Sequence, residues 1–190
     1  MERQEILELL TQIGVIQHGH FLLTSGRHSD TCMQSAHLFQ HPEYSEKLSG
    51  ALAEQLKGEA IDLVVGPAMG GVILAYEVAR QLGLENIYSE RVNGRMVFRR
   101  GFHIRKGQRV AIVEDVITTG ASVNEVMELV EEAGGVVAAI GVILNRAEGK
   151  VDFGVPLYSL IGIDVPSYPA NECPQCQQGI ALVKPGQANL

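Results

Sequence analysis

One segment, residues 110–122 (VAIVEDVITTGAS), constrains the fold of this chain more than any other. It starts with an apolar run of the kind found in buried strands and ends that run at two adjacent carboxylates, Glu114 and Asp115. A short turn rich in hydroxyl groups and glycine follows, and then a helical pattern begins. A buried strand that leads through such a turn into a helix is typical of α/β folds. It also offers a seat for a phosphate, because the N–H groups and the dipole of a helix start attract anions.

This segment suits a phosphorylated sugar. We expect the turn to hold the phosphate, and the carboxylates to bind the vicinal hydroxyls or the Mg²⁺ that lie beside a phosphate on a sugar. A purely structural turn with a solvated acidic pair is the alternative. A P-loop is excluded, because the chain contains no Gly-x-x-x-x-Gly-Lys-Ser/Thr. The turn consists of Thr118, Thr119, Gly120, Ala121 and Ser122.

The rest of the chain alternates between helical and extended patterns. The spacing of apolar residues predicts helices at 2–13, 42–57, 72–83 and 121–134, and strands at 61–66, 86–90, 109–115, 136–145 and 156–164. This alternation indicates βαβ units and an α/β fold with a mainly parallel central sheet flanked by helices. The tail, residues 166–190, is expected to be irregular.

Length and composition indicate a single soluble domain. A chain of 190 residues with 46% hydrophobic and 19% charged residues can bury a sizeable core. No apolar run reaches the length of a membrane span, and the charged N-terminus does not resemble a targeting peptide. We therefore expect a cytoplasmic protein without a membrane partner. The net charge of −7 argues against general nucleic-acid binding.

Positive charge is concentrated in one segment. Seven of the fifteen basic residues lie from Tyr88 to Arg109, where Glu90 is the one acid. An acidic protein with one cationic segment is expected to present that segment to an anionic ligand, and a solvated basic hairpin is the alternative. The seven residues are Arg91, Arg95, Arg99, Arg100, Arg105, Lys106 and Arg109.

Three loops follow predicted strands at the edge of the sheet where ligands of open parallel sheets collect, namely 66–71, 90–101 and 114–122. In the first of them, Gly70 and Gly71 would let the backbone approach a diphosphate closely. A tight turn that needs glycine for its dihedral angles is the alternative for that loop.

Three motifs resemble those of the type I phosphoribosyltransferases. The 110–122 segment resembles the family's signature for 5-phosphoribosyl 1-pyrophosphate (PRPP), and VVGPAMGGVILA (64–75) and FLLTSGRHSD (21–30) are similar to the orotate branch. The resemblance covers roughly residues 15–165. It implies a single phosphoribosyltransferase domain, with a small hood from about 1–40 plus the C-terminal segment and a core at about 41–165.

The resemblance also implies a reaction. Such an enzyme transfers ribose 5-phosphate from PRPP to orotate, giving orotidine 5′-monophosphate and pyrophosphate in pyrimidine (UMP) biosynthesis. Mg²⁺ would be required and held mainly by PRPP, without direct protein ligands. A homodimer is expected, with a mobile loop shared across the interface.

Site residues follow from the resemblance. Glu114 and Asp115 would engage the ribose hydroxyls and support catalysis, and the 118–122 turn would hold the 5-phosphate. The pyrophosphate side would be lined by Ala68, Met69, Gly70 and Gly71. Orotate would be bound by Thr118, Arg146, Ser25, Gly26 and Arg27.

The chain departs from the family pattern at charged positions. The family commonly has lysine where this chain has Thr24 and Gly70, and its mobile loop usually presents a lysine and a histidine. Here that loop has arginines and His103, with no lysine before Lys106. Arginine can replace the charge and bind phosphate bidentately. We therefore predict that Arg91, Arg99 and Arg100 act as catalytic residues that neutralise pyrophosphate.

Cys173 and Cys176 have the spacing of half a zinc site. Two more ligands would be needed, and Cys32 and the six histidines are all distant in sequence. We therefore favour unliganded thiols or a clip within the tail over zinc, while a disulfide or a site shared by two chains stays open. The histidines near the hood are expected at the surface or lining a pocket; they are His18, His20, His28 and His37.

Two rival functions are considered. A purine or uracil phosphoribosyltransferase would share the PRPP site, but the TSGRHSD element and Arg146 favour an acidic pyrimidine. A PRPP-sensing regulator would bind nucleic acid without catalysis. It should carry a DNA-binding segment or a broad basic face, and the net charge disfavours it.

Overall fold

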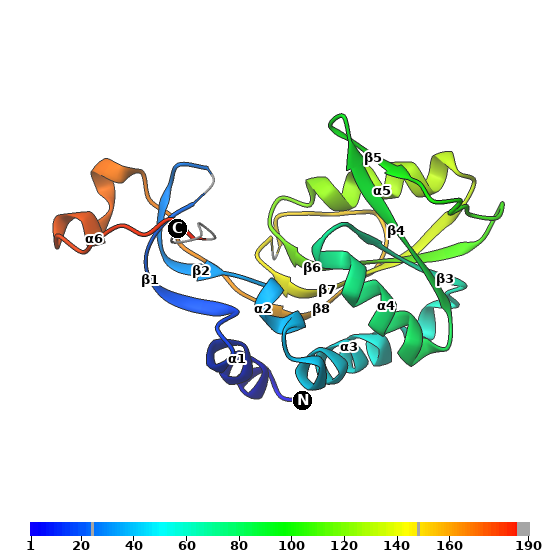
Figure 1. Cartoon of the computed structure of the whole chain (residues 1–190), viewed down its shortest axis with the longest axis horizontal. Coiled ribbons are helices and arrows are strands. Elements are labelled where there is room, and N and C mark those ends of the chain that lie inside the picture. The colour runs from blue at the N-terminus through cyan, green and yellow to red at the C-terminus, as the bar shows by residue number, and fades with distance from the viewer. Residues whose placement is uncertain (24, 148, 186–190) are drawn as a thin grey trace. The chain divides into compact units, whose positions relative to one another are not determined.

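The computed structural model describes residues 1–23, 25–147 and 149–185 (Figure 1). The chain forms two compact units, one of Met1–Gln40 with Asp164–Leu190 and the other of His41–Ile163. Among the described residues, no helix is both long enough and apolar enough to cross a membrane.

The larger unit is built on a six-stranded sheet with the order β5-β4-β3-β6-β7-β8. Neighbouring strands are parallel except β4 and β5, which form an antiparallel hairpin. The predicted α/β class with a mainly parallel sheet is therefore confirmed. The strands are β3 (Leu63–Pro67), β4 (Glu85–Val92), β5 (Arg95–Phe98), β6 (Arg109–Ile117), β7 (Val136–Asn145) and β8 (Leu157–Gly162).

Helices cover both faces of this sheet (Figure 1). Helices α3 and α4 pack against each other and against one face, and α5 packs on the other. The bounds are α3 (Pro42–Leu56), followed by the short 3-10 helix η1 (Lys57–Glu59), then α4 (Gly70–Leu82) and α5 (Ala121–Glu132).

Alternation along the central strands explains this layering. In β7, Ile140 and Val142 belong to the apolar cluster that contains Val126 of α5. The residue between them, Gly141, faces the other way, where a Cβ would come within 3.3 Å of Leu52 in α3. Successive side chains of a strand point to opposite faces, so a strand apolar at every position is covered on both sides.

Most predicted elements of the larger unit are confirmed, with shifted ends. Strand β6 continues to Ile117, and α4 already starts at Gly70. The basic segment contains a strand that was not predicted, β5, which turns back on β4 through Asn93 and Gly94, both with positive φ. The left-handed conformation at both turn positions is typical of a tight hairpin.

The smaller unit contains an antiparallel hairpin of β1 (Ile16–Leu22) and β2 (His28–Met33). The described part of the tail has little regular structure, as expected, but it is attached to this hairpin through isolated bridges from Val183 to Phe21 and from Tyr168 to His28. The pairing satisfies backbone groups at the hairpin's edges. The other elements are α1 (Arg3–Gln12), α2 (Ala36–Phe39), η2 (Ala170–Glu172) and α6 (Pro174–Gln177).

Candidate active site

The order of the strands places the candidate site. From β3 the chain moves through α4 to β4 on one side, whereas from β6 it moves through α5 to β7 on the other side. The direction of winding therefore reverses between β3 and β6, which are neighbours. Open α/β sheets bind ligands at the carboxyl ends of the strands next to such a reversal. The loops that follow these two strands are residues 68–69 and 118–120, each leading directly into a helix.

The loop after β6 has the geometry of an anion seat. Gly120 precedes α5 with a φ of 78°, and a Cβ there would lie 2.9 Å from Cζ of Phe153. Both the backbone conformation and the lack of space require glycine. Thr118 and Thr119 are exposed, and the loop encloses a small hollow of about 40 Å³. Residues 116–123 and Glu114 line this hollow, at the positive end of the α5 dipole.

The acidic pair at the end of β6 is asymmetric. Glu114 is 9% exposed, whereas Asp115 is half-buried and its Oδ1 accepts a hydrogen bond from the N–H of Val116 at 2.8 Å. Burial, reinforced by the charge of Asp115, raises the pKa of Glu114 to about 9. At neutral pH Glu114 of the ligand-free protein is therefore protonated.

The loop after β3 meets this acidic pair. A Cβ built on Gly70 would lie 2.0 Å from Oδ2 of Asp115, so the carboxylate rests directly against the glycine backbone. Before it, the Ala68–Met69 peptide bond is cis, and the Met69 side chain is 86% exposed. Gly71 is equally tight, because a Cβ there would lie 2.7 Å from Cδ of Pro67. The structure thus brings together the two loops in which a ribose site and a pyrophosphate site were predicted.

Arg146 lies beside the same loops. It follows β7 directly, is half-buried, and its backbone N–H donates to the carbonyl of Ile117 at 2.8 Å. This bond joins the segment after β7 to the start of the loop after β6. Arg146 is therefore held at the carboxyl edge of the sheet, where its backbone bonds to the residue that precedes Thr118.

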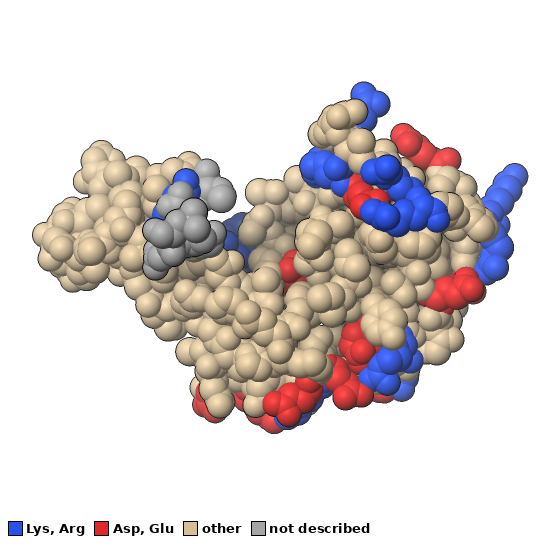
Figure 2. Space-filling view, in the orientation of Figure 1, with Lys and Arg blue, Asp and Glu red and all other residues tan. Residues whose placement is uncertain are grey.

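The predicted cationic residues lie on the β4–β5 hairpin and just after it. Arg91 binds Glu125 of α5 through both terminal nitrogens, each at 2.9 Å, and Arg100 donates to Glu90 at 2.8 Å. These hydrogen bonds lower the pKa of both carboxylates. Arg99 makes no ion pair with any described residue. Figure 2 shows basic side chains gathered over this hairpin with acidic ones among them.

The remaining predicted site residues belong to the smaller unit. Ser25, Gly26 and Arg27 form the turn between β1 and β2, where Gly26 has a φ of 77°. The Nε of Arg27 donates to Oγ of Ser167 at 2.8 Å, which ties this turn to the C-terminal segment. Thr24, where the family commonly has lysine, lies outside the described residues.

One cluster was missed in the sequence. His20 and His28 lie next to Cys173 and Cys176 within the smaller unit, although about 150 residues separate them in the chain. Both histidines are buried, so the expectation of a surface position is wrong for these two, whereas His18 is exposed as expected. The signal in the sequence was a Cys-x-x-Cys in the tail together with two histidines eight residues apart near the N-terminus.

Comparisons with known proteins agree on one family. The family model described as "Phosphoribosyl transferase domain" matches residues 34–155. The chain is 54% identical, over 100% of both chains, to the orotate phosphoribosyltransferase of Caldanaerobacter subterraneus subsp. tengcongensis. It is 50% identical to that of Thermotoga maritima, over 97% of this chain and 99% of the relative. Among solved structures, it is similar to orotate phosphoribosyltransferase from Aeropyrum pernix, with a TM-score of 0.68 and 25% identity over 83% of this chain and 93% of that one.

Proposed function

Because this chain belongs to the orotate phosphoribosyltransferase family, we propose that it binds its substrates at the carboxyl ends of β3 and β6. The enzyme transfers the 5-phosphoribosyl group from PRPP to orotate, and the products are orotidine 5′-monophosphate and pyrophosphate. The observation that carries the assignment of the site is the contact between the Asp115 carboxylate and the backbone of Gly70.

The phosphoribosyl group occupies the loop after β6. The 5-phosphate accepts hydrogen bonds from the N–H groups and hydroxyls of Thr118, Thr119, Gly120, Ala121 and Ser122, because these begin a helix and line the hollow. Asp115 and Glu114 take the ribose hydroxyls. When the bond from C1 to pyrophosphate breaks, positive charge develops on the ribose, and the negative acidic pair stabilises it.

The pyrophosphate group occupies the loop after β3. The N–H groups at the start of α4 are its natural donors, and the segment consists of Ala68, Met69, Gly70 and Gly71. Arg91, Arg99 and Arg100 neutralise the leaving group. Arg99 makes no ion pair among the described residues, although its charge acts on Glu90, whereas Arg91 and Arg100 must exchange their carboxylates for pyrophosphate oxygens.

The site also fits Mg²⁺. Asp115 presents carboxylate oxygens at the start of α4, and Mg²⁺ prefers oxygen ligands. The pyrophosphate oxygens of PRPP hold the ion, and no residue needs to ligate it directly. When bound, Mg²⁺ supplies positive charge that stabilises the departing pyrophosphate.

Orotate is recognised through its negative charge and planar ring. A guanidinium pairs with a carboxylate or stacks on a ring, and Arg146 supplies one directly after β7, where its backbone bonds to Ile117, the residue before Thr118. The assignment of Ser25, Gly26 and Arg27 to orotate binding stays a prediction from the family resemblance. We further propose that the enzyme works in the cytoplasm as a homodimer, with the Arg-rich loop acting on the partner's site.

The test measures pyrophosphate release from PRPP and Mg²⁺ with orotate, uracil, adenine or hypoxanthine as acceptor. Only orotate should support turnover. Asp115→Asn should lower kcat at least about 100-fold, because it removes the negative charge that the transition state needs. Asp152→Asn is the matched control, since Asp152 is exposed and accepts a hydrogen bond from the N–H of Gly154 in the same loop. Turnover with another base would refute the substrate assignment, and unchanged kinetics of Asp115→Asn would refute the site.

A further inference from the structure

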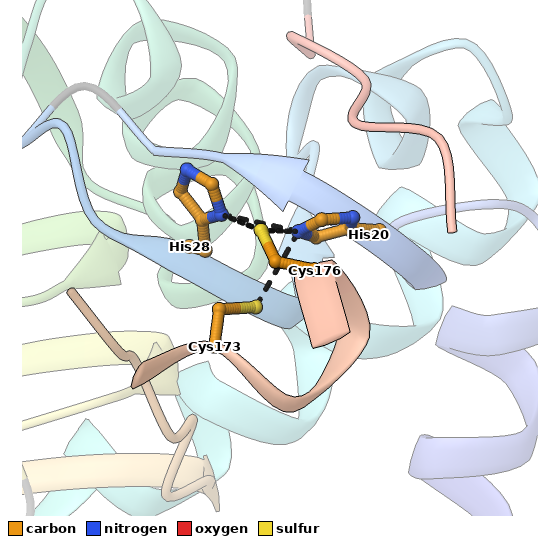
Figure 3. A group of neighbouring side chains, drawn as sticks. All are labelled: His20, His28, Cys173 and Cys176. Carbon is orange, nitrogen blue, oxygen red and sulfur yellow. Dashed lines mark hydrogen bonds between the residues drawn. The ribbon is translucent and has the colours of Figure 1, made fainter. Parts of the chain in front are cut away.

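Two imidazoles and two thiols of the smaller unit point toward one another (Figure 3). His20 comes from β1 and His28 from β2, whereas Cys173 and Cys176 come from the C-terminal segment around α6. One potential ligand atom of each residue lies within 4.8 Å of all the others. These are the four side chains of a Cys₂His₂ set, brought together by the pairing of the tail with the hairpin.

The separations match those between ligands of one ion. Sγ of Cys173 lies 3.4 Å from Nε2 of His20, and Sγ of Cys176 lies 3.2 Å from Nδ1 of His28. The two nitrogens are 3.1 Å apart. In a tetrahedron with Zn–S of about 2.3 Å and Zn–N of about 2.1 Å, an S···N edge is about 3.6 Å and an N···N edge about 3.4 Å. These three separations therefore differ from the edges of such a tetrahedron by only a few tenths of an ångström, and all four ligand atoms lie within 4.8 Å of one another.

A hydrogen bond from the Nδ1 of His20 fixes the orientation that a metal ligand needs. Its Nδ1 lies 2.7 Å from the carbonyl oxygen of Ile180, so this nitrogen carries the proton and donates. The lone pair of Nε2 then faces the cluster. Ligating histidines in metal sites usually donate their other ring N–H in this way. Three groups converge on that single lone pair, namely both thiols and the Nδ1 of His28. A lone pair accepts one of them well, whereas a metal ion would engage all four atoms.

Burial and charge favour an ion over free polar groups. His20, His28 and Cys173 are 2%, 6% and 1% exposed, whereas Cys176 is exposed at the outer side of the cluster. Two thiolates and two neutral imidazoles balance the charge of a divalent cation, so the loaded site would be neutral, which lowers the cost of burying its inner side. Zinc is the metal that a tetrahedral set of two sulfurs and two nitrogens selects.

We propose that His20, His28, Cys173 and Cys176 form a structural zinc site. All four positions are filled by protein side chains, which is the mark of a structural and not a catalytic site. The ion would fasten the C-terminal segment to the β1–β2 hairpin, where Gln175 already donates to the carbonyl of Gly19 at 2.8 Å. Small units with little core commonly need such a staple.

The test is the metal content of the full-length protein, expressed without an affinity tag and purified under reducing conditions. Elemental analysis should find about one zinc per chain. Cys176→Ser, Cys173→Ser, His20→Asn and His28→Asn should each lower zinc content at least about tenfold. Two matched controls should keep their zinc. Cys32→Ala removes the one cysteine outside the cluster, and His18→Asn removes an exposed histidine on the same strand as His20.

A second measurement does not depend on any variant. Wild-type protein stripped with a chelator should melt roughly 5 °C or more below the loaded protein and recover when zinc is added. Cobalt added to the stripped protein should give the absorption of tetrahedral thiolate coordination. The proposal is overturned if the reduced wild type takes up neither metal, if it takes up iron in preference to zinc, or if the ligand variants bind as the controls do. A Cys173–Cys176 disulfide that yields no zinc binding after reduction would overturn it as well.

Discussion

At the scale of single residues, two glycines of the larger unit share a backbone conformation but not their surroundings. Gly120 and Gly154 have φ values of 78° and 70°. A Cβ on Gly120 would lie 2.9 Å from Cζ of Phe153, whereas a Cβ on Gly154 would have no atom within 4 Å. Alanine therefore adds the same left-handed strain at both positions, but it adds a clash only in the proposed phosphate loop.

We expect Gly154→Ala to cost about 1 kcal/mol of unfolding free energy and Gly120→Ala about 2–4 kcal/mol, because the second adds overpacking to strain. The KM for PRPP should rise roughly tenfold or more in Gly120→Ala alone, since the loop must move away from Phe153. Urea unfolding and steady-state kinetics measure the two effects. Equal losses of stability would show that the Phe153 side chain moves aside at little cost. An unchanged KM would show that this loop does not bind the phosphate of PRPP.

The buried carboxyl of Glu114 should make the free energy of unfolding depend on pH. Its pKa is raised to about 9 in the folded protein, mainly by burial, so the fold favours the protonated form. This contribution to stability is complete below the ordinary pKa of 4.5 and is lost as pH rises through about 9. Glu114→Gln cannot ionise, so its advantage over wild type should grow with pH across that window, by at most about 1.4 kcal/mol per pH unit.

Urea unfolding of ligand-free wild type and Glu114→Gln at about pH 6 and about pH 8.5 checks this expectation. Glu128→Gln serves as the control, because Glu128 is an exposed carboxylate on α5 and its removal should leave the pH dependence unchanged. Parallel stability curves for wild type and Glu114→Gln would show that the buried carboxyl titrates as it does in the unfolded chain.

At the scale of elements, local sequence patterns predict most helices and strands of the larger unit. Strand β6 and helix α5 carry buried apolar residues at the periods expected for a strand and a helix, so their type could be predicted. The loop between them carries the PRPP motif, and the reversal of strand order brings it to the loop after β3. The ion pair from Arg91 to Glu125 was not predicted, because 34 residues separate its partners.

The hairpin of the smaller unit could not be predicted from local patterns. The buried positions of β2 include His28 and Ser29, which do not read as an apolar face. The Ser29 hydroxyl donates to the carbonyl of Pro166, 137 residues later, and His28 bonds to Tyr168 through its backbone and to Cys176 through its ring. A polar strand of this kind becomes stable only when its distant partner is in place, and no local period records that. The same long-range pairing hid two of the four proposed zinc ligands.

At the scale of the whole molecule, the proposed homodimer makes a prediction about where the arginines act. The first variant combines Arg91→Ala, Arg99→Ala and Arg100→Ala in one chain and should lose the charge that neutralises pyrophosphate. The second variant, Asp115→Asn, disables the ribose side of the site. Each variant should be nearly inactive alone. If the Arg-rich loop serves the partner's site, a mixed dimer of the two has one site built entirely from intact parts. Random mixing should then restore about a quarter of wild-type activity.

The control carries all four substitutions in one chain and is mixed with wild type. In the shared arrangement each site of that mixed dimer lacks either the arginines or Asp115, so activity should fall to about a quarter, from the remaining wild-type dimers alone. If each loop serves its own site, the first mixture stays inactive and the second retains about half of wild-type activity. The first mixture is thus more active if the loop is shared, whereas the second is more active if each loop serves its own site. Steady-state rates after subunit exchange, with the dimer verified by light scattering, therefore decide whether the cationic loop of one chain completes the site of the other.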